Sequence, residues 1–395
     1  MMSKISQRVQ KMSFSATLAM TQKARELKSK GHDVISLSIG EPDFNPPEFI
    51  QEAAISAIKE GFNSYTPVPG YAELREAISY KFKRDNNLDY SPEQIVVSNG
   101  AKQSITNVFL ATLNEGDEVI VPAPYWVSYI EMIKIADGIP IPVETSIETD
   151  FKITPKQLKE KITSKTKGFI FSSPCNPSGS LYSKEELQAL VDILKDYPDI
   201  IIVSDEIYEY INYTGQHTSI AQFLEIKEQT VTVNGMSKAF AMTGWRIGYI
   251  GAPLWLAKAC NKIQGQMTSG ANSVAQRASI KGLEAPVSEI QYMIDAFKSR
   301  RSLVLNMAQK IKGFKCNEPQ GAFYIFPDVS DLFGKTFNNF TINNSTDLAM
   351  YLLEYARVGT VSGDAFGSPN CLRISYAANE EQLKDAFKRI QEALA

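Results

Sequence analysis

The chain has 395 residues, more than one ordinary compact core needs, and its 44% hydrophobic content suffices for about two domains. Its net charge of −3 provides neither a basic field for nucleic acid nor a polybasic signal for a membrane surface. The most apolar stretches, such as 200–203, are far shorter than the ~20 residues that span a bilayer.

Cysteine and histidine usage restricts the chemistry further. The four cysteines are Cys175, Cys260, Cys316 and Cys371. No two of them have the spacing of a metal site or a disulfide framework, so we expect neither, and a reducing, cytoplasmic location follows as the default. The two histidines, His32 and His217, lie in polar stretches and are expected to be solvated loop residues. The chemistry must then come from lysine, aspartate, tyrosine or a cofactor.

Between residues 95 and 250, short apolar runs alternate with helical patterns. The expected strands are 95–98, 118–121, 168–172, 200–204 and 230–234. A helix is expected over 101–113, and another begins after Ser183, a typical N-cap residue followed by acidic side chains. Continuous apolar strands alternating with helices predict an α/β fold with a mostly parallel sheet covered on both faces.

The pattern changes after about residue 285. The expected elements are a long helix over 288–312, a strand over 322–326, a polar, Asn-rich surface excursion over 328–346, a helix over 347–356, a strand over 372–375 and a helix over 380–394. We expect the first ~45 residues to pack with this part of the chain. The predicted organisation is a large domain over 46–287 and a smaller α/β domain from both chain ends, 1–45 and 288–395.

A lysine follows the last of the central strands. Lys238 lies among small residues in Asn234-Gly235-Met236-Ser237-Lys238, and Arg246 comes eight residues later. A lysine amine at a strand end, in a partly dry pocket, can form a Schiff base with an aldehyde cofactor. Taken alone, the motif fits an ordinary surface-loop lysine better.

An aspartate follows the apolar strand at 200–203. The carboxyl ends of strands are where α/β sheets bind ligands. Asp205 can hold a protonated pyridine nitrogen there, and Tyr208 can bond a phenolic oxygen on the same ring. A helix N-cap is an equally good interpretation of the aspartate alone.

Three other strand ends carry polar or aromatic groups. Gly100 leads from a strand into a helix, whose free amides at Ala101 and Lys102 suit a phosphate, or form a simple turn. Neither G-x-x-x-x-G-K nor a G-x-G-x-x-G after a strand is present, which disfavours nucleotide-binding folds. A Pro-bracketed loop presents Asn176, and Trp126 follows another strand, where its indole can stack on a cofactor or simply pack.

An arginine interrupts an apolar strand near the C-terminus. Arg373 in Leu372-Arg373-Ile374-Ser375 is costly to bury unless it is paired. Its planar guanidinium suits a substrate carboxylate, although a structural ion pair explains it equally well.

The joint order of these motifs resembles the fold-type I, class I aminotransferases over essentially the whole chain, and most closely the bacterial aspartate aminotransferases of the Ib subgroup. The segments that carry the resemblance are Ser15-Ala16-Thr17, Gly40-Glu41-Pro42-Asp43-Phe44, Tyr65-Thr66-Pro67, Gly100-Ala101-Lys102-Gln103, Tyr125-Trp126-Val127-Ser128-Tyr129, Asn176-Pro177-Ser178-Gly179, Asp205-Glu206-Ile207-Tyr208, Ser237-Lys238-Ala239-Phe240-Ala241-Met242-Thr243-Gly244-Trp245-Arg246 and Arg373-Ile374-Ser375. The resemblance implies a seven-stranded sheet between helices and pyridoxal 5′-phosphate as the cofactor.

The resemblance also implies roles for single residues. Lys238 carries the cofactor and shuttles a proton, and Asp205 holds the ring nitrogen. Tyr208 and Asn176 bond the ring's 3-oxygen, and Trp126 stacks on the ring. The residues implied at the phosphate are Gly100, Ala101, Lys102, Ser237, Arg246 and, from the neighbouring subunit, Tyr65. A homodimer with shared sites follows.

For the substrate, the resemblance implies that Arg373 holds the α-carboxylate, with Gly40, Trp126 and Asn176 lining the site. Lys102, helped by Ser15 and Thr17, would bind a distal carboxylate. The implied activity is transfer of the amino group of L-aspartate to 2-oxoglutarate by a ping-pong mechanism.

Other reactions stay open. The alternatives are another amino donor, aromatic or prephenate-linked, and a lyase reaction on the same cofactor. Relatives that accept prephenate carry a basic residue near the position of Ser13, which argues against that activity here, although Lys11 lies close by. Further departures from the family pattern are Cys175, where asparagine is frequent, and the segment 358–363, which lacks the usual proline.

Overall fold

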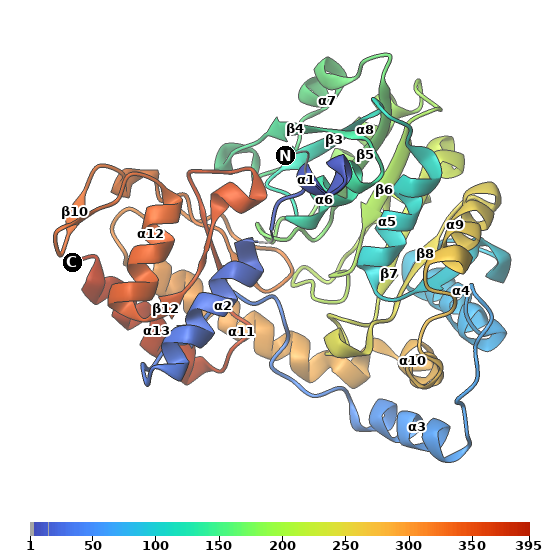
Figure 1. The fold of residues 1–395 in the computed structure, drawn as a ribbon, viewed down its shortest axis with the longest axis horizontal. Helices are drawn as coiled ribbons and strands as arrows, with labels where there is room; N and C mark the ends of the chain where they lie inside the picture. Colours follow the sequence, from blue (N-terminus) through green and yellow to red (C-terminus); the bar gives the residue numbers. More distant parts are fainter. Residues whose placement is uncertain (1–3, 15) are drawn as a thin grey trace.

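A computed structural model describes residues 4–14 and 16–395 and contains the expected central sheet (Figure 1). Its strands are β2 (Ile95–Ser98), β3 (Glu118–Ala123), β4 (Ile139–Glu144), β5 (Thr166–Ser172), β6 (Ile201–Asp205), β7 (Thr230–Gly235) and β8 (Gly248–Gly251). They are ordered β2-β8-β7-β6-β5-β3-β4, and only β8 runs antiparallel to its neighbours. The predicted fold class, a mostly parallel seven-stranded sheet, is therefore confirmed.

Helices cover both faces of this sheet, because alternate side chains of its strands are apolar on each face. Residues such as Val119, Ile170 and Val203 pack with α5 (Ala101–Thr112), α6 (Ser128–Ile135) and α9 (Leu254–Met267). Their strand neighbours Ile120 and Phe169 pack on the other side with α7 (Pro155–Lys161) and α8 (Lys184–Leu194). The β2–β8 end is covered by α3 (Glu48–Lys59), α4 (Ala72–Asn86) and α10 (Ser273–Glu284).

Local sequence explains where the helices begin. Ser183 caps α8 through a reciprocal capping box with Glu186, as its sequence predicts. Asn379 caps α13 (Glu380–Ala393) by accepting a hydrogen bond from the amide of Gln382. The buried stripe of α13, which includes Leu383 and Phe387 four residues apart, faces the C-terminal core.

The C-terminal part has its own small sheets. Its elements are α11 (Gln291–Ala308), β9 (Tyr324–Ile325), β10 (Thr336–Phe337), β11 (Phe340–Thr341), α12 (Ser345–Tyr351), a π-helical turn over Leu352–Ala356, β12 (Val358–Gly359), β13 (Val361–Ser362) and β14 (Leu372–Ser375). The strands β13, β14 and β9 form an antiparallel sheet, and the expected surface excursion contains the short β10–β11 hairpin.

The N-terminal segment touches both parts of the molecule. The strand β1 (Ile35–Ser36) pairs with β12, and α2 (Ala16–Ser29) lies beside the C-terminal elements in Figure 1. The short helix α1 (Gln7–Gln10) contacts α6, and Arg8 bonds Asp137, just after the end of α6, at 2.6 Å. The proposed domain limits at 45/46 and 287/288 remain a prediction. Within the described residues, no helix is long and apolar enough to cross a membrane.

Candidate active site

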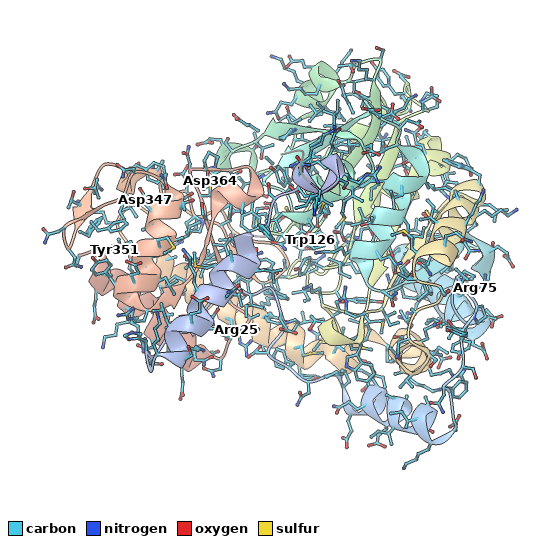
Figure 2. The ribbon with its side chains drawn as sticks, in the orientation of Figure 1. Arg25, Arg75, Trp126, Asp347, Tyr351 and Asp364 are labelled. Carbon is cyan, nitrogen blue, oxygen red and sulfur yellow. The ribbon has the colours of Figure 1, made fainter. Side chains whose placement is uncertain are left out.

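A cavity of about 260 Å³ opens where the carboxyl ends of β5, β6 and β7 meet the start of α5. The register brings these chain segments together, because Ser98 at the end of β2 and Gly235 at the end of β7 both lie opposite Gly248 at the start of β8. The predicted residues that line the cavity are Thr17, Gly40, Ala101, Lys102, Trp126, Asn176, Asp205, Tyr208, Ser237, Lys238, Arg246 and Arg373. Trp126 lies near the middle of the molecule in Figure 2.

Lys238 projects into this cavity from the connection between β7 and β8. Its ammonium donates a 2.6 Å hydrogen bond to the carbonyl oxygen of Gly40. Burial, followed by the repulsion of Arg373, lowers the pKa of Lys238 to about 8. An amine with this pKa is partly unprotonated near neutral pH and can therefore act as a nucleophile.

Asp205 ends β6 at the floor of the cavity and is almost fully buried. Its Oδ2 accepts a 2.6 Å hydrogen bond from the hydroxyl of Tyr129, and its Oδ1 accepts one of 3.3 Å from the amide of Ile207. Burial raises the pKa of Asp205 to about 6, an effect that the bond from Tyr129 opposes. The carboxylate is thus ionised at neutral pH and suited to a cationic partner.

Arg246 lies against the start of α5. A side chain added at Gly100 would place its Cβ 2.2 Å from the Arg246 Nη2, so glycine is required for this approach. The guanidinium also bonds the carbonyl oxygens of Thr243 and Asn99. Gly100 offers no side-chain cap, and the first amides of a helix have no intrahelical partner. A guanidinium beside free amides makes this point suitable for a phosphate.

Tyr208 and Tyr324 both line the cavity, and their hydroxyls lie 2.8 Å apart. Burial, and secondarily Tyr324, raises the pKa of Tyr208 well above its ordinary value, so the phenol stays protonated. A side chain at Gly40 would collide with the Tyr324 hydroxyl, because the added Cβ would lie 2.2 Å from it. Tyr324, which reaches the site from β9, was not among the residues predicted from the sequence.

Arg373 is 2% exposed and has no acidic partner among the residues that the structure describes. It donates to the side-chain oxygen of Asn176 at 3.0 Å and to the carbonyl of Ser38 at 2.6 Å, while its Nε lacks a partner. Burial lowers the pKa of Arg373 below its ordinary value. A buried cation without a counter-ion, with one donor unused, is suited to an anionic ligand.

Lys102 supplies a further cation to the cavity, beside Lys238, Arg246 and Arg373. Its ammonium lies 5.1 Å from the ring centroid of Trp126, and burial, followed by Arg246, lowers its pKa. Thr17 lines the same cavity from α2. Apart from a phosphate at Arg246, the pocket therefore favours a ligand with negative charge at two points, one at Arg373 and one at Lys102.

Some predicted residues lie elsewhere. Tyr65 is 98% exposed and does not line the cavity of this chain, so its role across a subunit interface stays a prediction. Ser15 lies outside the described residues. The cavity walls also include Tyr129, Ser172 and Thr243, which the sequence analysis did not select. Tyr129 and Thr243 lie in segments that carry the family resemblance but were assigned no role there, and Ser172 ends β5.

One expectation is wrong. His217 is not solvated: its side chain is 9% exposed, and its Nε2 lies 2.9 Å from a carboxylate oxygen of Glu206. Glu206, which follows the end of β6, packs against the loop that carries His217. The hydroxyls of Ser204 and Ser219 also donate hydrogen bonds to Glu206. His32 is exposed, as expected.

Residues 32–390 match the family described as aminotransferase class I and II. A bifunctional aspartate aminotransferase and glutamate/aspartate-prephenate aminotransferase of Petunia hybrida is 48% identical, over 99% of this chain and 82% of the relative. An aspartate aminotransferase of Bacillus subtilis is 45% identical, over 98% of each chain. A solved aspartate aminotransferase of Thermus thermophilus with maleate superposes with a TM-score of 0.93 at 41% identity, over all of both chains. The chain belongs to the class I and II aminotransferases.

Proposed function

We propose that this aminotransferase uses pyridoxal 5′-phosphate to transfer the amino group of L-aspartate to 2-oxoglutarate, giving oxaloacetate and L-glutamate. The observation that carries the proposal is one cavity lined by Lys238, Asp205 and Arg246 together with two further cations, Arg373 and Lys102. The first three suit the cofactor, and the other two suit a dicarboxylic substrate. The names of the similar proteins, with maleate bound to one of them, support the same substrate class.

The donor set of the cavity fits the cofactor. Arg246 and the amides of Ala101 and Lys102 would hold its phosphate beside Gly100, with Ser237 adjacent, and the ionised Asp205 would hold its ring nitrogen. The side chains proposed for the ring's 3-oxygen and face are Tyr208, Asn176 and Trp126. When bound, pyridoxal phosphate supplies an aldehyde for amines and an electron-withdrawing ring for the substrate α-carbon.

The chain's own residues then bind the substrate and move its proton. Arg373 orients the α-carboxylate, and its rigid fork matches two carboxylate oxygens. Lys102, with Thr17 and Ser15 nearby, holds the distal carboxylate. Lys238, whose Nζ lies beside Gly40, takes the α-proton at that atom once it is unprotonated. Closure around the substrate would exclude water from these groups.

A homodimer belongs to the same proposal. The aromatic side chain of Tyr65 is almost fully exposed, and we infer that its hydroxyl reaches the phosphate site of a partner subunit. A cytoplasmic location is likewise proposed, on the four free cysteines that the structure describes.

An absorbance experiment tests the central claim. The protein is reconstituted with pyridoxal phosphate, and its visible band is followed on adding aspartate without any keto acid. The native band should shift, with release of oxaloacetate, whereas Lys238→Ala should show no lysine-bound cofactor. Lys281→Ala, which removes an exposed lysine on α10, is the matched control. If the native protein forms no band, the cofactor claim is refuted; a band that aspartate leaves unchanged refutes the substrate claim.

The name of the Petunia relative motivates a second acceptor, prephenate. Glutamate-dependent amination of prephenate, measured beside the aspartate reaction, decides whether this chain shares it. Release of pyruvate together with ammonia, from a donor that carries a leaving group on its β-carbon, would instead indicate lyase chemistry.

A further inference from the structure

Tyr129, in the first turn of α6, connects two groups of the cavity that come from different strands. Its hydroxyl donates the 2.6 Å hydrogen bond to Asp205 Oδ2 across 76 residues of sequence. Its ring meets that of Trp126 edge to face, with centroids 5.5 Å apart and planes at 88°. Its backbone amide also donates to the carbonyl of Trp126 at 2.9 Å. The side chain of Tyr129 is buried, so these contacts fix one rotamer.

The hydroxyl of Tyr129 can act only as the donor in this bond when Asp205 is ionised. Burial, followed by the charge of Asp205, holds the pKa of Tyr129 well above its ordinary value, so the proton stays on the phenol. The other oxygen of Asp205 is only partly engaged, by the amide of Ile207. The remaining lone pairs of the carboxylate lie on the cavity wall.

We propose that Tyr129 is a positioning residue for the cofactor: from one helix turn it holds the Asp205 carboxylate in its ionised form and in one orientation, and it fixes the edge of the Trp126 indole. The proposal rests on the proposed function only in assigning Asp205 and Trp126 to the ring nitrogen and the ring face. Tyr129 therefore fixes the position of Asp205, at the cofactor's ring nitrogen, relative to that of Trp126, on the face of the same ring.

Other charged and titratable groups also act on Asp205. They are Glu206 on its own strand end, Lys238 from the β7–β8 connection, Tyr208 from the following turn and the Cys175 thiol from the loop after β5. Among them, Glu206 opposes ionisation and Lys238 favours it. Tyr129→Phe leaves all of these in place and removes only the Tyr129 hydroxyl, which donates to Asp205 and also contacts Ser172.

The first measurement uses the apoprotein, so that it does not depend on the cofactor. With ¹³C-labelled aspartate, the infrared band of the protonated Asp205 carboxyl is followed against pH and identified by subtracting Asp205→Asn. In Tyr129→Phe we expect the protonation constant of Asp205 to rise tenfold or more, which is about one pKa unit or more. Tyr90→Phe is the matched control, because it removes a buried hydroxyl that bonds Thr232, away from the cavity.

A second measurement needs no Tyr129 variant. In the native apoprotein, a near-ultraviolet tyrosine difference signal should titrate with a midpoint near that of Asp205, about 6, and should vanish in Asp205→Asn. If Asp205 titrates identically in Tyr129→Phe and the native chain, or if the tyrosine signal persists in Asp205→Asn, the proposal is wrong.

A third measurement concerns the cofactor. The affinity of the apoprotein for pyridoxamine phosphate, which forms no bond to Lys238, should fall at least tenfold in Tyr129→Phe at pH 7 and remain native in Tyr90→Phe. Unchanged affinity overturns the positioning role. If the native chain binds no pyridoxamine phosphate while the apoprotein titrations behave as expected, the proposed cofactor fails and the Tyr129–Asp205 coupling stands.

Discussion

The substitution Arg373→Met distinguishes the effect of the buried Arg373 charge on protein stability from its effect on substrate binding. Methionine keeps an unbranched stem against Tyr324 and Phe366, whose ring centroids lie 4.7 and 4.8 Å from the guanidinium carbon. The substitution removes a charge whose burial costs several kcal/mol and leaves two acceptors, on Asn176 and Ser38, without their donor. Each acceptor that loses its donor costs about 1–3 kcal/mol. Because this cost and the relief of the buried charge offset each other, we expect the apoprotein's free energy of unfolding to change by no more than about 1 kcal/mol.

The same substitution should strongly lower the catalytic efficiency of the enzyme with its substrate. Removing one partner of a buried, hydrogen-bonded charge pair costs about 3–5 kcal/mol, which corresponds to a fall in kcat/KM for aspartate of about 10² to 10⁴-fold. Arg373→Lys keeps the charge without the fork and should lie between methionine and the native residue. Urea unfolding of the apoprotein and steady-state kinetics of the holoenzyme give the two numbers. An apoprotein weakened by more than about 3 kcal/mol, or a kcat/KM within tenfold of native, would refute the reasoning.

Three other predictions follow from the site. Lys102→Met should lower kcat/KM for aspartate about 10- to 100-fold while leaving a monocarboxylic donor such as alanine nearly unchanged, and equal losses for both donors in steady-state assays would contradict this. Gly248→Ala should cost more than about 3 kcal/mol in urea unfolding and weaken phosphate binding, since its Cβ would lie 2.1 Å from the Ala101 backbone nitrogen; native stability would contradict the packing. Lys238 has a pKa of about 8 when folded against 10.5 when unfolded, so between these values only the unfolded chain holds the proton and apoprotein stability should rise with pH through that window. Lys238→Met should abolish this rise in Tm, and an identical rise in both proteins would exclude Lys238 as its source.

The central strands could be predicted because their side chains are apolar on both faces. The runs at 95–98 and 230–234 correspond to β2 and β7 within one residue. Two strands of the central sheet were missed, each for its own reason. β4 is an edge strand, Ile139–Glu144, whose two prolines and exposed positions hide its pairing. β8 has only four residues, two of them glycine, and is recognisable only through its neighbours.

The lining of the cavity was predictable where a residue lies at or just after the end of a strand. Lys238 and Asp205 follow β7 and end β6, and the rule that ligands bind at the carboxyl ends of parallel strands selected both. Tyr324 and Tyr129 act through contacts with residues far away in sequence, to Tyr208 and Asp205, which no local pattern encodes. The prediction that His217 is solvated was wrong for the same reason. Its sequence neighbours are polar, but its burial depends on a contact with Glu206.

The insertion of β8 between β2 and β7 has a consequence for folding kinetics. The pairs Ile95–Gly251 and Ser98–Gly248 join segments about 150 residues apart, so a long loop must close before this part of the sheet can form. Until it closes, Arg246 cannot approach Gly100, and the end of the cavity proposed to bind the phosphate does not exist. Phosphate or cofactor added during refolding should therefore leave the early, collapsed phase unchanged and act only on the last step, by slowing its reversal.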